Sequence, residues 1–376
     1  MHVVLDARYI ARRQSGVGAY TQRLITGLAT IDQRNRYTCL VATEGPGLPV
    51  RQANIAASPT RVSFEDHLRG DLWLLGYLPF RLRALRTDVY HGPAVFLPHV
   101  KLGFRTVVTI HDLVSFLFPE TVPRKYSLYM RLMTRLAARS ADRIIAVSEA
   151  TKADLVETLR VPPAKIAVIH EAVGPEFARP LLPEAIETVI RRYGLRRPYC
   201  LFVGNLEPRK NLPALIEAFA DVRRRLGSAQ LVLAGTRAWL HAGIFRAVEQ
   251  YRVGDAVVFT DYVPLGDLPA LYAGATCFVF PSLYEGFGLP VLEAMAAGAP
   301  VVAARAGSIP EVAGDAALLV DARAPGELAT AIEAVLTDQA LRERLVARGH
   351  ARARTFEWNT VARQTLAVYE AVYARR

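Results

Sequence analysis

Residues 276–294 read TCFVFPSLYEGFGLPVLEA, and their pattern predicts the fold class. Its first five residues are apolar or β-branched, which predicts a strand buried on both faces. Gly286 and Gly288 permit a tight turn, and Pro290 suits the first turn of a helix. A buried strand, a glycine turn and a helix in this order predict a parallel α/β sheet, and nucleotides and anions bind at the carboxyl edge of such sheets.

The same alternation of strand and helix continues along the whole chain. Strands are expected at 2–5, 37–42, 61–64, 87–90, 106–110, 143–147, 166–169, 199–203, 230–234, 256–259, 276–280, 300–303 and 317–320. Helices are expected at 18–30, 123–139, 149–159, 211–226, 239–251, 266–273, 289–297, 325–337, 339–354 and 356–374. Two such series predict two doubly wound, Rossmann-like domains.

Prolines indicate where the two domains meet. Four of them lie between residues 175 and 198, around a polar helix, which is typical of a linker. We therefore expect an N-terminal domain over residues 1–175 and a C-terminal domain over residues 176–355. The last helix, within residues 356–376, follows a complete second domain and is expected to pack back on the first.

The composition predicts a folded, basic protein. Of the 376 residues, 52% are hydrophobic and 22% are charged, which argues against disorder. The net charge of +11 suits nucleic acid, anionic lipid or small anionic substrates and does not choose among them. No stretch reaches the roughly 18 apolar residues of a membrane span, and no signal-peptide core is visible. The three cysteines lie far apart in apolar runs, so reduced thiols and a cytoplasmic location are expected.

Two carboxylates accompany the glycine turn. Glu285 lies in the loop, and Glu293 lies a turn into the following helix. Both would repel a phosphate, so each is expected to face hydroxyl groups, which a sugar and a ribose both offer. The amides expected to face an anion are those of Phe287, Gly288 and Leu289. The alternative is a Gly-Pro turn that opens a core helix, with Glu293 in solvent.

A second candidate site lies at residues 202–211, which read FVGNLEPRKN between a strand and a helix. Adjacent Arg209 and Lys210 could neutralise a diphosphate, and such compensation matters for a departing nucleoside diphosphate. The alternative is a solvated basic turn.

The N-terminal half has two further candidates. Residues 14–21 read QSGVGAYT, and Gly16 and Gly18 would let a backbone approach a phosphate at a helix start. His111 and Asp112 follow an apolar strand, so they are expected at the carboxyl edge of the sheet. His111 could bond the transferred sugar, and Asp112 could orient it or contact the acceptor; a structural histidine is the alternative.

Two helices of the N-terminal half carry basic side chains. One begins at Ser148, which is expected to cap it, and carries Lys152, which could face a cleft. The other lies within residues 123–143 and repeats arginine every four residues, which could place it on anionic lipid near a lipid-linked acceptor. An ordinary domain helix with a solvated basic face is the alternative. The repeated arginines are Arg131, Arg135 and Arg139.

Together these motifs resemble the GT-B glycosyltransferases of glycosyltransferase family 4, a retaining group with many mannosyltransferases. The resemblance covers nearly the whole chain, from the Gly16 loop to the terminal helix with Phe356 and Trp358. Its most specific element is the pair Glu285 and Glu293, with seven residues between them. It implies two Rossmann-like domains that face each other across a cleft holding a nucleotide diphosphate sugar.

The resemblance also implies residue roles. Glu285 would contact the transferred sugar, and Glu293 would hold the ribose hydroxyls. Arg209 and Lys210 would grip the diphosphate, and His111 would contact the sugar on its reactive side. Backbone amides would assist in binding the donor, and they belong to Gly16, Phe287, Gly288 and Leu289. The backbone of Val263 would contact the nucleobase.

One position departs from the family pattern. Asn205 stands where many members carry arginine, so Arg209 would take over some of that charge. The family retains anomeric configuration, which implies a same-face substitution in which the donor phosphate helps to deprotonate the acceptor. No metal-ligand cluster stands out, so we expect no metal and no cofactor.

The expected activity is transfer of a hexose to a saccharide or lipid-linked saccharide, in cell-surface polysaccharide or glycolipid synthesis. GDP-mannose is the leading donor, with UDP- and dTDP-sugars open. One alternative is a GT-B sugar-nucleotide epimerase, against which the glutamate pair and its glycine turn argue. Another is a nucleic-acid-binding protein, but the sequence lacks an aromatic stacking motif or a recognition module, so no nucleic-acid partner is expected.

Overall fold

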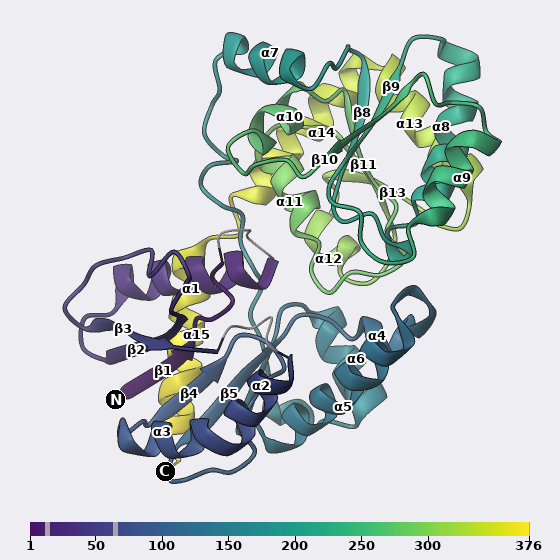
Figure 1. Cartoon of the computed structure of the whole chain (residues 1–376). Coiled ribbons are helices and arrows are strands. Elements are labelled where there is room, and N and C mark those ends of the chain that lie inside the picture. Colours follow the sequence, from purple (N-terminus) through teal and green to yellow (C-terminus); the bar gives the residue numbers. More distant parts are fainter. Residues whose placement is uncertain (12–15, 63–66, 376) are drawn as a thin grey trace. The chain divides into compact units, whose positions relative to one another are not determined.

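The computed structural model describes residues 1–11, 16–62 and 67–375, and the chain divides into two compact units (Figure 1). The first unit consists of Met1–Leu113, Leu128–Glu171 and Glu357–Arg376, and the second of Val114–Ser127 and Ala172–Phe356. The sequence assigned residues 114–127 to the N-terminal domain. The structure groups them with the second unit, in which Phe118 stacks on Tyr284 and Tyr126 lies beside Trp239.

Within the described residues, the first unit is built on a parallel sheet in the order β3-β2-β1-β4-β5-β6-β7. Its strands are β1 (His2–Asp6), β2 (Arg36–Ala42), β3 (Ile55–Thr60), β4 (Val89–Gly92), β5 (Arg105–Ile110), β6 (Arg143–Ala146) and β7 (Ile166–Val168). Its main helices are α1 (Gly16–Ile31), α2 (His67–Leu72), α3 (Leu78–Ala84), most of α5 (Arg124–Ser140), α6 (Glu149–Leu159) and α15 (Trp358–Tyr373). The central strands are buried on both faces, as their apolar runs predict.

The strand expected at residues 61–64 is wrong, since β3 ends at Thr60; residues 63 and 64 lie outside the described part of the chain. β3 contains Pro59, which argues against a central strand. It is tolerated here because β3 lies next to β2 at the edge of the described sheet.

The second unit repeats this architecture, with a described sheet in the order β10-β9-β8-β11-β12-β13. Its strands are β8 (Tyr199–Val203), β9 (Gln230–Ala234), β10 (Val257–Asp261), β11 (Cys277–Phe280), β12 (Val301–Ala304) and β13 (Ala317–Val320). Its helices are α4 (Val114–Leu117), α7 (Pro183–Arg192), α8 (Leu212–Leu226), α9 (Ala242–Gln250), α10 (Leu268–Gly274), α11 (Leu289–Ala296), α12 (Ile309–Ala313), α13 (Pro325–Thr337) and α14 (Gln339–Ala353). All neighbouring strands are parallel, so both sheets expected from the sequence are present.

The last helix, α15, belongs to the first unit and packs along α1. The contact is close at Gly27, where an added Cβ would lie 3.0 Å from the Cβ of Ala362. The hydroxyl of Tyr369 lies 2.6 Å from the Nδ1 of His91 on β4. No helix in the described ranges is long and apolar enough to span a membrane.

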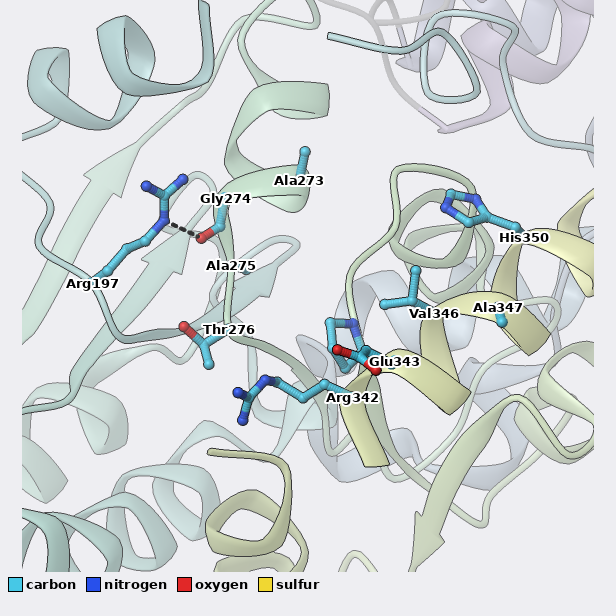
Figure 2. Close-up of a pocket in the computed structure, with 11 residues that line it drawn as sticks. Arg197, Ala273, Gly274, Ala275, Thr276, Arg342, Glu343, Val346, Ala347 and His350 are labelled. Carbon is cyan, nitrogen blue, oxygen red and sulfur yellow. Dashed lines mark hydrogen bonds between the residues drawn. The ribbon is translucent and has the colours of Figure 1, made fainter. Parts of the chain in front are cut away.

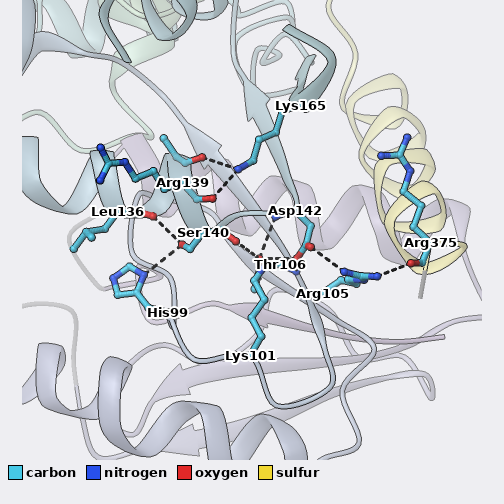
Figure 3. A network of polar contacts seen from close by, with 11 residues as sticks. His99, Lys101, Arg105, Thr106, Leu136, Arg139, Ser140, Asp142, Lys165 and Arg375 are labelled. Atoms are coloured by element: carbon cyan, nitrogen blue, oxygen red, sulfur yellow. Dashed lines mark hydrogen bonds and ion pairs between the residues drawn. The ribbon is translucent and has the colours of Figure 1, made fainter. Parts of the chain in front are cut away.

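A polar network fixes the amino-terminal edge of the first sheet (Figure 3). Asp142 lies just before β6, and its carboxylate accepts a hydrogen bond from the backbone N–H of Thr106 at 2.8 Å. The Nζ of Lys101 lies 2.7 Å from the same carboxylate, and the Nη1 of Arg105 lies 3.2 Å from it. This network lies at the edge opposite the carboxyl ends of the strands, where it joins the loop before β5 to the start of β6.

Candidate functional site

The strand order of the second unit reverses between β8 and β11, and ligands bind α/β sheets at such a switch point. After β8 the chain forms a short 3-10 turn at Pro208–Lys210, and after β11 it forms the turn that leads into α11. The backbone N–H of Leu283 donates to the carbonyl oxygen of Arg209 at 2.9 Å. The structure therefore joins two motifs that the sequence predicted separately.

An ion cluster connects these two loops. The Nζ of Lys210 lies 2.6 Å, and the Nη1 of Arg209 2.7 Å, from the Oε1 of Glu285. The Nη2 of Arg209 also lies 2.7 Å from the Oε1 of Glu207, which sequence reasoning missed. Lys210 lies over the Phe280 ring, with Nζ 4.9 Å from the ring centre. Two buried or half-buried cations and two buried carboxylates thus meet at the switch point.

The electrostatics of this cluster keep Glu285 charged. Burial would raise the pKa of Glu285, but the charges and hydrogen bonds of Arg209 and Lys210 outweigh it and lower the pKa to about 2. Burial, together with the charge of Arg209, lowers the pKa of Lys210, and the carboxylates of Glu285 and Glu207 oppose that change. Glu285 is therefore a carboxylate at neutral pH and acts only as a hydrogen-bond acceptor.

The turn after Glu285 is fixed by Ser308, for which the sequence analysis predicts no role. The hydroxyl of Ser308 donates to the carbonyl oxygen of Phe287 at 2.7 Å, and its N–H donates to that of Glu285 at 3.1 Å. Gly307 has φ +53, and a Cβ there would clash with the backbone of Glu285. Gly288 has φ +97, a left-handed conformation that favours glycine. Tight packing therefore sets the position of the Glu285 backbone.

Glu293 lies on α11 and is half-buried. Its Oε2 accepts a hydrogen bond from the hydroxyl of Tyr272 at 3.0 Å. Burial raises the pKa of Tyr272 well above its ordinary value, and the charge of Glu293 raises it further. Tyr272 is therefore a neutral hydrogen-bond donor that orients the Glu293 carboxylate. The sequence did not indicate this residue.

The other predicted donor-site residues of this unit lie on loops after neighbouring strands. Asn205 is exposed and accepts a hydrogen bond from the hydroxyl of Thr236 at 2.9 Å. Its neighbour Gly204 comes so close to Gly235 that a Cβ on Gly235 would clash with the Gly204 backbone. Val263 lies just after β10 and is buried. The close approach of Gly204 and Gly235 brings together the loops after β8 and β9. The sequence did not predict this contact.

In the first unit, His111 follows β5 and is bound on both sides. Its Nδ1 lies 2.7 Å from the Oε1 of Glu171, and its Nε2 lies 2.8 Å from the carbonyl oxygen of Pro93. Both partners are acceptors, so both ring nitrogens donate only in the imidazolium form. Burial would lower the pKa of His111, but the hydrogen bond and charge of buried Glu171 outweigh it and raise the pKa. The ring that is predicted to contact the sugar is therefore held by two acceptors, Glu171 and Pro93.

The Gly16 and Gly18 helix packs beside His111. The ring of Tyr20 on α1 meets the His111 ring edge-on, with centroids 4.9 Å apart, and its hydroxyl lies 3.1 Å from the Oγ1 of Thr109. Gly16 is exposed at the start of α1, and Gly18 is buried. The first two residues of that motif, 14 and 15, lie outside the described ranges.

Asp112 and Lys152 lie at the same edge of the first sheet. Ser148 caps α6 by accepting a hydrogen bond from the Thr151 N–H at 2.9 Å, as predicted. The Thr151 hydroxyl lies 3.4 Å from the carbonyl oxygen of His111, which brings the start of α6 next to that residue. Asp112 is half-buried, and the Nζ of Lys152 pairs with Glu149 at 3.2 Å.

A cavity of about 710 Å³ lies at the opposite, amino-terminal edge of the second sheet (Figure 2). Thr276 and Pro300, which precede β11 and β12, lie in its wall, and Arg197 donates from Nε to the carbonyl oxygen of Gly274 at 3.2 Å. None of the predicted site residues lines it, so we assign it no part in the donor site. Across the described ranges, no cluster of three or more His, Cys, Asp or Glu residues could hold a metal ion.

Two family models match the chain. "Glycosyltransferase Family 4" matches residues 14–177, and "Glycosyl transferases group 1" matches residues 187–352. The O-antigen chain mannosyltransferase B of Escherichia coli is 36% identical over 294 residues, which covers 77% of this chain and 76% of that protein.

Solved structures share the fold at low sequence identity. Sucrose-phosphate synthase from Thermosynechococcus elongatus matches with a TM-score of 0.79 and 20% identity, over 100% of this chain and 99% of that one. HepE from Anabaena, solved in complex with UDP and glucose, matches with a TM-score of 0.74 and 19% identity, over 98% and 99% of the two chains.

Proposed function

The chain belongs to glycosyltransferase family 4 and has the two-domain GT-B fold, and we propose that it transfers mannose from GDP-mannose to a saccharide acceptor. Glycosyl transfer itself follows from the family. The choice of mannose rests on the Escherichia coli relative, which is an O-antigen chain mannosyltransferase. A growing cell-surface polysaccharide or glycolipid is accordingly the proposed acceptor.

The ion cluster of Arg209, Lys210 and Glu285 is the observation that carries the proposal. A diphosphate that enters this site offers Arg209 and Lys210 stronger acceptors than one shared carboxylate oxygen, and charge-assisted bonds to phosphate are strong. Glu285 is then available to accept hydrogen bonds from the sugar hydroxyls. We propose that these two cations stabilise the departing diphosphate without a metal ion.

We propose that the start of α11 and the residues near it bind the remaining parts of the donor, which are the phosphates, the ribose and the base. The amides of Phe287, Gly288 and Leu289 lie at a helix N-terminus, which favours anions. Glu293, oriented by Tyr272, is proposed to hold the ribose hydroxyls. Val263 is proposed to contact the base through its backbone, and Asn205 to lie near the diphosphate.

The proposed reaction retains the anomeric configuration. The bond between the anomeric carbon and the diphosphate oxygen breaks, and the acceptor oxygen forms its bond on the same face. A phosphate oxygen of the leaving group takes the proton of the acceptor hydroxyl. In the first unit, His111 is proposed to contact the sugar, Gly16 and Gly18 the phosphate, and Asp112 and Lys152 the acceptor.

We further propose that α5 rests on anionic lipid near a lipid-linked acceptor. Leu128 and Leu132 are 59% and 55% exposed, and they share the solvent-facing side of the helix with Arg124, Arg135 and Arg139. Exposed leucines among arginines suit the interface of an anionic bilayer. Co-sedimentation with anionic and neutral liposomes tests this; L128S/L132S should lose the binding, and binding that is independent of anionic lipid would exclude it.

The donor is tested by thermal shift against GDP-mannose, UDP-glucose, dTDP-glucose and the free nucleotides. A ligand at 100 times its Kd stabilises the fold by about 2.7 kcal/mol, so the preferred base shows directly. GDP-mannose should give the largest shift; a larger shift with a UDP- or dTDP-sugar would replace mannose in the proposal.

The catalytic assignment is tested by E285Q in a transfer assay with a saccharide acceptor. Loss of an electrostatic contact to the reacting sugar should lower turnover by about 100-fold or more while the protein stays folded. E343Q, at the distant cavity, is the matched control and should keep full activity. Near wild-type turnover of E285Q would refute the assignment. In a separate incubation of the wild type with donor alone, conversion of the donor to an epimer would show that the protein is an epimerase.

A further inference from the structure

The segment Val114–Ser127 follows β5 in sequence but packs within the second unit. The ring of Phe118 stacks on that of Tyr284, with centroids 5.6 Å apart and an angle of 27° between the planes. The ring of Tyr126 lies 5.3 Å from that of Trp239, whose Nε1 donates to the carbonyl oxygen of Thr121 at 3.1 Å. Phe118, Thr121 and Tyr126 therefore contact two separate loops of the second unit. These three residues are called the clasp below.

The clasp has its own internal structure. The N–H of Phe118 donates to the carbonyl oxygen of Val114 at 2.8 Å, and the hydroxyl of Thr121 donates to that of Phe118 at 2.7 Å. The hydroxyl of Ser127 donates to the carbonyl oxygen of Ser115 at 3.1 Å and so joins the two ends of the segment. These bonds hold the backbone of the segment that carries Phe118.

Both loops that the clasp contacts lead to the ion cluster. Tyr284 precedes Glu285, is 4% exposed, and accepts a hydrogen bond on its carbonyl oxygen from the Nη1 of Arg209 at 2.7 Å. Trp239 follows Ala238, whose N–H donates to the carbonyl oxygen of Leu206 in the loop after β8. The clasp therefore contacts the loop of Glu285 directly and the loop of Arg209 through Trp239.

We infer that Phe118 is a positioning residue that holds Tyr284, and through it the Glu285 carboxylate and the Arg209 guanidinium, in the arrangement that transfer requires. The inference deepens the proposed function and rests on it for the role of Glu285. The Phe118 ring restricts the Tyr284 side chain. The peptide group between Tyr284 and Glu285 then stays in place, so its carbonyl oxygen keeps the hydrogen bond from Arg209 and the Glu285 side chain keeps its direction. Phe118 itself touches no reacting atom.

Kinetics of F118A, F118Y and L117A test the inference. Leu117 is the matched control, since it is the preceding residue, is 38% exposed and takes no part in the clasp. F118A should lower kcat at least tenfold with the fold intact, F118Y should restore it to within about twofold, and L117A should match the wild type. If F118A does not fold, F118L, which keeps most of the apolar volume without the ring, replaces it. Wild-type kcat in F118A, or an equal loss in L117A, would overturn the inference.

A second measurement is independent of activity. Hydrogen exchange of the peptide covering residues 281–288 should be faster in F118A than in the wild type and unchanged in F118Y. If the wild type transferred no sugar from any donor, the proposed function would fail while this exchange measurement still decided whether the clasp holds the loop. Unchanged exchange in F118A would overturn the clasp even in an active enzyme.

Discussion

The Nζ of Lys210 lies 2.6 Å from the Oε1 of Glu285, across 75 residues of sequence, and both side chains are almost fully buried. Breaking such a pair by removing one partner leaves an uncompensated charge, whereas replacing both partners by apolar groups is often neutral. We therefore expect the Lys210–Glu285 pair to contribute to sugar transfer rather than to the free energy of unfolding.

The variants K210M and K210M/E285M separate these two roles. K210M leaves Glu285 buried with Arg209 alone and should lower the free energy of unfolding by about 3 kcal/mol. The double variant should recover most of that loss in a urea titration, while both variants stay inactive in transfer. Equal destabilisation of the single and double variants would contradict this account.

Gly307 gives a steric test of the Glu285 turn. Its φ of +53 is strained for any residue with a side chain, and a Cβ would clash with the Glu285 backbone. G307A should therefore lower the free energy of unfolding by at least about 2 kcal/mol and reduce turnover, because the turn has to move.

The control for that variant is G326A. Gly326 lies at the start of α13, has no heavy atom within 4 Å of an added Cβ, and has no positive φ. The chemically identical change should leave both the thermal midpoint and turnover near the wild type. If the two variants behaved alike, the close approach at Gly307 would not matter.

The fold was largely predictable because most strands are buried on both faces. β11 and β8 carry unbroken apolar runs, so their sequence pattern differs from that of the amphipathic helices. β3 was missed because an edge strand lacks this pattern: its middle residues are partly exposed, and Pro59 resembles a turn signal. α3 was missed because the residues that lead into it, 72–80, are almost all apolar and show no helical period.

Local sequence signals single out the charged residues of the candidate site but not the residues that support them. Lys210 and Glu285 each stand in a turn directly after a strand, which is a local signal. Ser308 and Glu171 have no such signal, because their partners lie 23 and 60 residues away in sequence. Only the fold shows that they lie next to Glu285 and His111.

His111 should titrate above its ordinary range. Its raised pKa means that the ion pair with Glu171 contributes stability below about pH 6.5, and that this contribution is lost as the pH rises through the pKa of the folded state. E171Q should therefore destabilise the protein more at pH 6 than at pH 9. The His111 ring proton, followed by NMR, should titrate at lower pH in E171Q than in the wild type; pH-independent destabilisation would contradict the imidazolium assignment.

Asp142 should show the opposite pH dependence. Burial would raise its pKa, but the hydrogen bonds from Lys101 and the Thr106 N–H outweigh it and lower the pKa (Figure 3). A lowered pKa gives stability that is present above the ordinary value near 3.8 and is lost as the pH falls through the pKa of the folded state.

D142N should accordingly cost about 2 kcal/mol of unfolding free energy at pH 7, and the difference from the wild type should shrink toward pH 3. Urea titrations across this range measure it. Because Asp142 lies at the edge of the sheet away from His111, turnover per folded molecule should not change. A loss of turnover without a loss of stability would mean that this network acts on the reaction and not only on the fold.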